Sequence, residues 1–320
     1  ALARGPVVPA VLQQAVDDDV DVGAALERAA AAGLVVPVEQ GWTFTHGALR
    51  QAIAAGLNRG RRARMHQDLA DALAALPERS EHDLLEAARH RARTDPDTIG
   101  RRQFDDLVEA GRICLDHTAW GDAAEMLTTA DRALAHLTVS EADRAWLDYR
   151  RGRALYHDQR AEEARRCLER ACDEGRRLGD TRLEALALGA IARQVHSHES
   201  EALFDLLARL DDALDRLAGS SPDALHLERW RIQLLLFLGR IDEASAAARR
   251  ARHLADEVGT TADVTGAASD TAMTCRAEAR PGAALAALAP LGEVTGDDAG
   301  LIEARQALAL LMGGRLSEAA

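Results

Sequence analysis

Residues 159–171 read QRAEEARRCLERA, and a phrase of this kind recurs along the chain. Residues 119–130 read AWGDAAEMLTTA, and residues 239–251 read GRIDEASAAARRA. Each copy begins with turn and polar residues and then runs into Ala, Leu, Glu and Arg, which are strong helix formers. The recurrence predicts a helical repeat, with a turn at the start of each copy.

The copies align on an alanine at their sixth residue. The full copies supply Ala124, Ala164 and Ala244, and weaker copies that begin at Ser197, Ala279 and Gly314 supply Ala202, Ala284 and Ala319. The spacing is about 40 residues, which is typical of stacked helical hairpins. A small residue at this position would let the two helices of a hairpin approach closely. Because the last copy stops at Ala320, we expect the repeat array to be truncated there.

Turn residues separate the predicted helices. They form the segments LGDT (178–181), AGSSPD (218–223), VGTT (258–261) and TGDD (295–298). A Gly suits the left-handed end of one helix, and a following Ser, Thr or Asp suits the cap of the next. Pro222 fits the first turn of a new helix. Each copy is therefore predicted to join a first and a second helix.

Composition supports an all-α chain. Of its 320 residues 47% are hydrophobic but only 3% are aromatic, so Ala and Leu must build most of the core. The net charge is −13, which argues against a nucleic-acid-binding surface. The sequence contains no Lys, so the Lys-dependent phosphate-binding loop of nucleotide-binding proteins is excluded within it.

The first hundred residues follow a different pattern. A short apolar helix over 7–16 is followed by DDDVD at 17–21, which we interpret as a helix cap rather than an acidic binding cluster. A second helix should end at Gly33. Strands are then predicted in LVVPV (34–38) and WTFT (42–45), before a helix that begins after His46. Helix, helix, hairpin and helix is the layout of a winged-helix unit.

The repeats resemble the tetratricopeptide family. In the copy around residue 159, small and large residues alternate as that motif requires, at Gly152, Leu155, Ala164, Leu168 and Ala171. The copy around residue 239 departs from the motif where Ile stands at the small position, and the period exceeds the usual roughly 34 residues. The resemblance implies a right-handed superhelix of antiparallel helix hairpins. A non-repetitive helical bundle is the alternative.

A second resemblance concerns the junction before the repeats. AAAAGLVV (29–36), WTFTHGALRQAI (42–53) and RGRRARMHQDLADAL (59–73) are similar to the segment that follows the nucleotide-binding domain in LuxR- and MalT-type signal-transduction ATPases. This resemblance implies a winged-helix-like unit at 1–57, linking helices at 58–118 and a repeat region at 119–320. ATP would then bind only to an upstream domain, and DNA only to other parts of such a regulator.

No enzymatic or metal-binding motif is evident. The four Cys residues form no C-x-x-C pair, and no G-x-S-x-G sequence occurs. His196 and His198 lack a third ligand, so an exposed loop is the preferred interpretation. The basic run RGRRAR (59–64) could contact phosphates, but a solvated helix start or an intramolecular contact is favoured. No apolar segment is long enough to span a bilayer, and we expect a cytoplasmic, non-catalytic protein.

The tetratricopeptide pattern also implies a binding groove lined by the first helices. Its predicted residues are Trp146, Tyr149, Arg153, Tyr156 and His157, then His226, Arg229 and Gln233, and finally Met273 and Arg276. Aromatic and Arg side chains anchor peptides and anions well, although the same residues could pack between repeats. We expect a small effector, a peptide or a protein as the partner. The function is then either effector sensing within a bacterial LuxR-family regulator or that of a stand-alone adaptor. A homo-oligomer is compatible with either.

Overall fold

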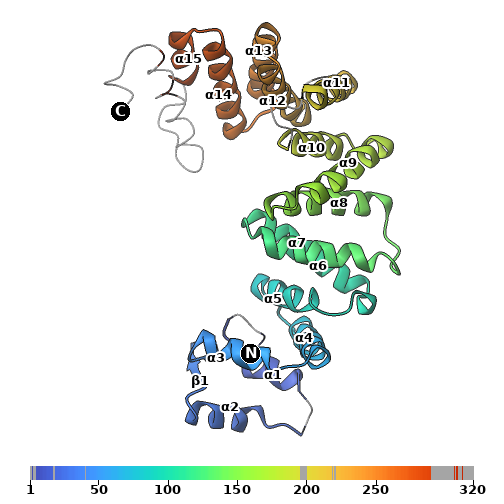
Figure 1. Cartoon of the computed structure of the whole chain (residues 1–320), viewed down its shortest axis with the longest axis vertical. Helices are drawn as coiled ribbons and strands as arrows, with labels where there is room; N and C mark the ends of the chain where they lie inside the picture. The colour runs from blue at the N-terminus through green and yellow to red at the C-terminus, as the bar shows by residue number, and fades with distance from the viewer. Residues whose placement is uncertain are drawn as a thin grey trace. The chain divides into compact units, whose positions relative to one another are not determined.

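The computed structural model describes residues 5–289 apart from 17–18, 40, 195–199, 218 and 220, together with Leu2 and the isolated positions 306, 308 and 312. The chain forms two compact units, 1–160 and 161–320. Both units consist mainly of helices that pack against their neighbours in the sequence (Figure 1). His196, His198, the segment 295–298 and the last repeat copy lie outside the described residues.

The first unit combines a small strand pair with eight described α-helices. Its elements are α1 (Pro9–Gln14), α2 (Val22–Ala31), β1 (Val35–Val38), β2 (Gly41–Phe44), α3 (Gly47–Ala55), α4 (Arg59–Ala74), α5 (Glu81–Arg91), the 3₁₀ turn η1 (Pro96–Thr98), α6 (Arg101–Asp116), α7 (Trp120–Ala133) and α8 (Glu141–His157). Helices α4 and α5 pair, α6 and α7 pair, and α8 packs on both α6 and α7. The segment 58–118, predicted as linking helices, therefore already contains a helix hairpin.

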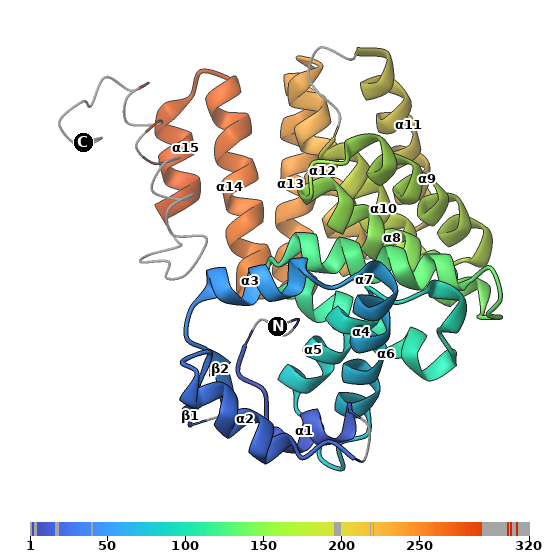
Figure 2. The same cartoon turned by 60° about the horizontal axis from the view of Figure 1, so that its bottom comes forward.

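The described part of the second unit is entirely helical. Its elements are α9 (Ala161–Leu178), α10 (Thr181–Ala192), α11 (Ser200–Arg216), α12 (Pro222–Phe237), α13 (Ile241–Val258), α14 (Thr261–Ala277) and α15 (Pro281–Leu288). The pairs α12–α13 and α14–α15 form hairpins, and Figure 2 shows the second of these side by side. The predicted all-α chain of antiparallel helix hairpins, with one strand pair near its start, is confirmed.

The strand pair is set by local sequence signals. The Oδ1 atom of Asp21 accepts a hydrogen bond from the Ala24 amide at 3.0 Å, so the acidic segment does cap α2. Gly33 follows α2 with a φ of +69°, as predicted. Strands β1 and β2 pair antiparallel, with Val35 opposite Phe44. The predicted strands and the helix end are thus confirmed within about one residue.

One extended segment was not predicted. Val7 forms an antiparallel bridge with Trp42, and their backbone N–H groups donate to each other's carbonyls at 2.9 and 3.0 Å. Gly41 makes this approach possible, because a Cβ atom there would lie 2.5 Å from the Val7 oxygen. The helix predicted over 7–16 therefore begins only at Pro9. Val7 and Val8 are adjacent apolar residues with no two-residue alternation, so the sequence offered no signal for the bridge.

The turns before the second helices share one geometry. Thr118, Gln159, Gly239 and Ala279 all have φ between +56° and +71°. In each turn the next amide donates to the carbonyl five residues earlier, as from Arg240 to Leu235 at 2.9 Å. This is the Schellman motif, which normally places Gly at the left-handed position. Three of the four turns use a residue with a side chain instead.

This geometry corrects the alignment of the first repeat copy. The left-handed residues lie five positions before Ala123, Ala164, Ala244 and Ala284, each of which is 0% exposed. Ala124, which the sequence alignment placed with Ala164, is one residue too late. Its neighbour Ala123 is also alanine, so the sequence could not decide between the two.

Arginine–carboxylate pairs connect helices within each unit. They include Arg89–Asp122 and Arg93–Glu125 in the first unit, and Arg209–Glu169, Arg216–Glu184, Arg229–Asp270, Arg231–Asp211 and Arg250–Glu228 in the second. Several of the carboxylates are buried, such as Glu184 and Glu228, so their guanidinium partners remove the cost of an isolated buried charge. The charged residues therefore contribute to packing as well as to the surface.

Candidate ligand-binding face of the first helices

The first helices are those that lead into the turns: α6 and α8 in the first unit, and α10, α12 and α14 in the second. Neighbouring first helices contact each other, α6 with α8, α10 with α12, and α12 with α14. Their adjoining sides are here called the first-helix face of each unit. All ten groove residues predicted from the sequence lie on α8, α12 or α14.

A cavity of about 290 Å³ opens on the first-helix face of the first unit. It is lined by Arg101, Phe104, Asp105, Val108 and Glu109 of α6, and by Asp143, Trp146 and Arg150 of α8. Of the predicted groove residues only Trp146 lines it. The sequence analysis did not identify the α6 residues, because the recurring phrase that defines each copy lies on the second helix and contains no residue of α6.

Aromatic rings and guanidinium groups in contact with one another form the α8 side of this face. The Trp146 and Tyr149 rings meet edge to face with centroids 5.8 Å apart. The guanidinium of Arg150 lies 5.8 Å from the centre of the Trp146 ring, and that of Arg153 lies 5.7 Å from the centre of the Tyr149 ring. These distances are typical of cation–π contacts. Tyr149 is only 7% exposed, so it supports the face more than it forms its surface.

A second ring cluster ends α8. His157 stacks on Trp120 with ring centroids 4.0 Å apart and planes at 16°, and Tyr156 meets His157 edge to face at 5.2 Å. Trp120 is the first residue of α7, so this cluster joins the end of α8 to the start of α7. The structure therefore divides the five predicted α8 residues into two groups, Trp146, Tyr149 and Arg153 in one, and Tyr156 and His157 in the other.

The charges around the cavity are only partly paired. The Nε atom of Arg101 donates to both carboxylate oxygens of Asp105, at 3.0 and 3.1 Å. Glu109 accepts two hydrogen bonds from Arg112, which hold the pKa of Glu109 below its usual value. Arg150 makes no hydrogen bond or ion pair with any residue that the structure describes, and burial lowers its pKa.

In the second unit, His226 packs tightly against α10. A Cβ atom on Gly189 would lie 2.4 Å from both the His226 Nε2 and the Trp230 Nε1 atoms, so only Gly fits at this position. Burial lowers the pKa of His226 to about 4, with smaller contributions from Arg229 and Arg193. The imidazole is therefore neutral at pH 7, and within the described part of the chain its buried Nε2 atom has no hydrogen-bond partner.

Arg229 and Gln233 turn toward α14. The Nε atom of Arg229 donates to the Asp270 Oδ2 at 2.8 Å, and Gln233 donates to the Asp270 Oδ1 at 3.4 Å. Gln233 also approaches the Met273 sulfur at 3.9 Å. Together with His226, these side chains join α10, α12 and α14. The sequence had left open whether the predicted groove residues bind a ligand or pack between repeats, and these side chains pack between helices. A ligand-binding role for His226, Arg229 and Gln233 stays a prediction.

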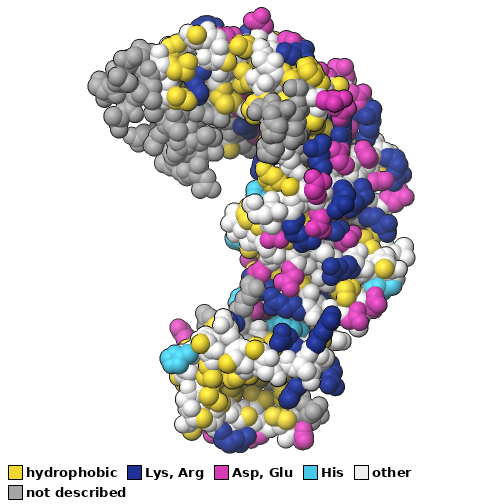
Figure 3. Space-filling model, in the orientation of Figure 1, with side chains coloured by type: hydrophobic (Ala, Val, Ile, Leu, Met, Phe, Trp, Pro, Cys, Tyr) yellow, Lys and Arg dark blue, Asp and Glu magenta, His cyan; other side chains and the backbone are white. Residues whose placement is uncertain are grey.

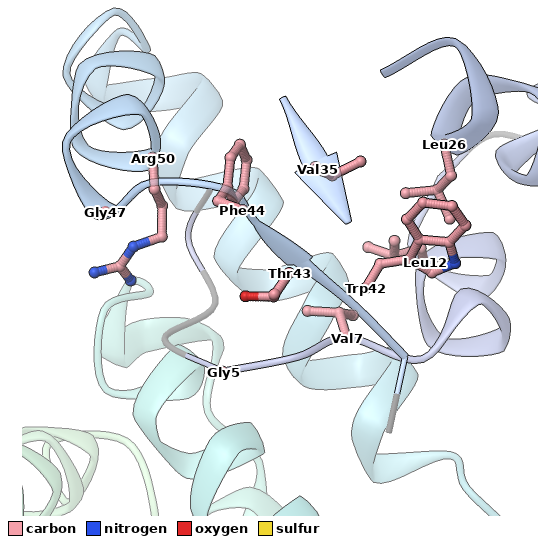
Figure 4. A pocket seen from close by; sticks show the side chains of 10 residues that line it. All are labelled: Gly5, Val7, Leu12, Leu26, Val35, Trp42, Thr43, Phe44, Gly47 and Arg50. Atoms are coloured by element: carbon pink, nitrogen blue, oxygen red, sulfur yellow. The ribbon is translucent and has the colours of Figure 1, made fainter. Parts of the chain in front are cut away.

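A further cavity of about 420 Å³ lies among the N-terminal elements. Figure 4 shows Trp42 beside Leu12 and Leu26, whereas the guanidinium of Arg50 is directed away from these side chains. Hydrophobic side chains surround a hollow in this part of the surface (Figure 3). Three successive residues of β2, Trp42, Thr43 and Phe44, line the cavity.

Some reactive side chains outside these cavities are buried. His66 and His90 face each other with 2.8 Å between their Nδ1 atoms, and burial is the main cause that lowers both pKa values to about 4. Burial also raises the pKa of the Cys172 thiol to about 11, so this sulfur is protonated at pH 7. Across the described ranges no three His, Cys, Asp or Glu side chains come together as a metal site would require.

Two further features lie at the junction before the repeats, His46 and the basic run at 59–64. His46 occupies the N-cap position of α3, but its side chain makes no capping hydrogen bond within the described structure. The basic run at 59–64 forms the first turns of α4, where the Asn58 side chain caps the helix and Arg62 donates to the Ala54 carbonyl at 2.7 Å. This agrees with the interpretation of the run as a helix start.

Comparison with known proteins supports the fold. No family model matches the sequence, and no curated protein matches it. Among solved structures, a Rap protein complexed with competence and sporulation factor is similar, with 14% identity and a TM-score of 0.50 over 84% of this chain and 82% of that one. A signal transduction ATPase with numerous domains and a tetratricopeptide repeat sensor, from Pyrococcus horikoshii, matches at 13% identity and a TM-score of 0.45, over 99% of this chain and 50% of that one. The similarity to the Rap structure thus supports the helical-repeat fold.

Proposed function

We propose that this chain is a helical-repeat binding region whose first-helix face holds an effector or a partner protein. The observation that carries this proposal is the cavity between α6 and α8, with Trp146 on its wall and Arg150, which has no hydrogen-bond or ion-pair partner among the described residues. Aromatic rings and guanidinium groups supply much of the binding free energy at protein interfaces. The similar Rap structure holds the competence and sporulation factor, which supports a binding role for a fold of this kind.

At a finer level, we propose the sensor region of a LuxR- or MalT-type bacterial transcriptional regulator. The support is the sequence resemblance at 29–73 and the bridge of Val7 to Trp42, which adds a third extended segment to the strand pair as a winged helix would have. In this proposal the region is cytoplasmic and non-catalytic, and ATP and DNA bind to other domains. No helix in the described residues is both long and apolar enough to cross a bilayer.

The binding function is tested with the Arg153→Glu variant. Arg153 is half-buried, and its guanidinium lies over the Tyr149 ring. Within the described structure it makes no hydrogen bond or ion pair. A thermal-shift screen of small effectors and nucleotides, with a pull-down for protein partners, should yield a ligand that the variant no longer binds. A ligand that binds the variant with unchanged affinity would place the binding site elsewhere.

The regulator is distinguished from a stand-alone adaptor by the coding sequence that adjoins residues 1–320. A nucleotide-binding loop encoded upstream supports the regulator. A complete gene that encodes only helical repeats supports the adaptor.

A further inference from the structure

One charged pair on α8 is unmatched around the cavity between α6 and α8. Arg101 neutralises Asp105, and Arg112 neutralises Glu109. This leaves Asp143 and Arg150, which lie on the same side of α8 because they are seven residues apart. Among the described residues, Asp143 forms a long ion pair with Arg101 at 3.9 Å, which is longer than a hydrogen bond.

Trp146 lies between these two charges on the helix. Trp146 is half-buried and lines the cavity together with Val108. The cationic guanidinium of Arg150 lies against its ring. Arg153 lies about one turn further along α8, and it also has no ion pair with a described residue. The face is therefore anionic toward the start of α8, apolar in the middle and cationic toward its end.

The size of the cavity limits the occupant. About 290 Å³ lies at the lower end of the range for small-molecule pockets, which begins near roughly 300 Å³. The side chains of Arg101, Asp105 and Asp143 are more than half exposed, so the rim is open to solvent, whereas Phe104 is 3% exposed. A ligand of one residue's size could thus enter, contact the apolar centre and reach both unmatched charges.

We propose that this cavity binds a free α-amino acid with an apolar side chain. Its carboxylate accepts hydrogen bonds from Arg150, its ammonium group donates to Asp143, and its side chain packs on Trp146 and Val108. A ligand without a carboxylate would leave the half-buried Arg150 without an anionic partner, and a partly buried charge without a partner is costly. Asp143 is more than half exposed, so its contact with the ammonium group favours a zwitterion without removing a burial cost. The inference rests on the proposed function, because it names the ligand class of the first-helix face.

Calorimetric titration of the full chain tests the inference with leucine, methionine and phenylalanine as probes. At least one should bind at a single site. Its amide, which lacks the carboxylate, and its N-acetyl derivative, which lacks the ammonium group, should each bind about tenfold more weakly or worse. These analogues test both charges without changing the protein. The titration extends to an amino-acid concentration of 10 mM, and a dissociation constant of this size corresponds to a binding free energy of roughly −3 kcal/mol. No binding within this range would overturn the inference. Equal affinity for the amino acid and its amide would also overturn it.

Variants then locate the binding site. Arg150→Gln and Asp143→Asn should each lose at least about tenfold in affinity. The matched control is Arg144→Gln, an exposed Arg on the same helix that does not line the cavity, and its affinity should be unchanged. Unchanged affinity in Arg150→Gln would contradict the assigned site. If no amino acid binds but the effector screen still finds a ligand that Arg153→Glu abolishes, this inference fails and the proposed function stands.

Discussion

Arg229 on α12 and Asp270 on α14 are 41 residues apart in the chain, and their Nε and Oδ2 atoms lie 2.8 Å apart. The Asp270 side chain is 3% exposed, whereas that of Arg229 is 38% exposed. A Cβ atom on Gly266 would lie 2.4 Å from the Arg229 guanidinium, so the backbone of α14 passes directly beneath this pair. Two successive first helices are thus joined by a charge pair whose acidic half is buried.

Replacing Asp270 with Ala should destabilise the second unit strongly. The change leaves the Arg229 guanidinium without its carboxylate and opens a gap beneath Gln233. Because Arg229 is 38% exposed, water can partly solvate its guanidinium, so the expected cost is that of lost hydrogen bonds to a charged group, about 1.5–3 kcal/mol. Urea denaturation should show this loss, whereas Asp256→Ala, at a position where the side chain is 57% exposed, should change stability little. Equal stability of the two variants would show that the pair does not hold the helices together.

Gly189→Ala should also lower stability. The added methyl group would meet the His226 and Trp230 rings at 2.4 Å, and overpacking of this kind costs about 1–3 kcal/mol. Gly282 in α15 is the matched control, because a Cβ atom there would have no described atom within 4 Å. Gly282→Ala should leave the melting temperature unchanged or raise it, since Ala is the better helix former. A neutral Gly189→Ala variant would contradict the close packing of α10 and α12.

The left-handed turn residues offer a way to stabilise the chain. Thr118 has a φ of +56°, and a β-branched residue in this region is strained. Thr118→Gly should raise the melting temperature by about 2–4 °C if it gains about 1 kcal/mol. The reverse change at the equivalent turn, Gly239→Ala, should lower it by a similar amount. A lower melting temperature for Thr118→Gly, or a higher one for Gly239→Ala, in differential scanning calorimetry would show that the turns differ from the geometry described.

Acid should destabilise the first unit through His66 and His90. Both pKa values are about 4 in the folded chain, below the usual value of 6.5, so the unfolded chain binds more protons between these values. The stabilisation is complete above about pH 6.5 and is lost as the pH falls toward 4. The neighbouring guanidinium groups of Arg62, Arg89 and Arg93 lower these pKa values further, because they are cationic.

Melting temperatures at pH 7 and pH 5 measure this effect. The fall between them should be smaller in the double variant His66→Asn and His90→Asn, because Asn does not titrate and can keep a hydrogen bond at this position. The control is His253→Asn, whose side chain is 74% exposed and which should keep the wild-type fall. An unchanged fall in the double variant would assign the acid sensitivity to other groups.

Much of the helical fold follows from the sequence, because its signals are local. Asp21, Ser221 and Thr260 each cap a helix through a side-chain oxygen, and all three lie in segments predicted as caps or turns. Only one of the four Schellman turns that precede second helices carries the expected Gly, however. At Thr118 no Gly marked the turn, and the repeat alignment shifted by one residue.

The candidate site was harder to predict, because it depends on contacts between helices far apart in sequence. Helical spacing placed Trp146 and Arg153 on one face of α8. It could not show that Arg101 and Phe104 of α6 complete the cavity, or that Tyr149 is buried. The same spacing placed His226 and Arg229 in the predicted groove. Whether such residues face a ligand or a neighbouring helix depends on glycines such as Gly189, whose role appears only when the two helices are brought together.

The arginine–carboxylate pairs between helices also determine how the chain should respond to alkali. Since the sequence contains no Lys, every one of these links uses a guanidinium group, which keeps its proton to beyond about pH 12. A lysine-based scaffold would begin to lose such links near pH 10, where ammonium groups deprotonate. In this protein the charged links between repeats are effectively permanent above neutral pH, and reagents that acetylate or cross-link lysine side chains have no ε-amino group here with which to react.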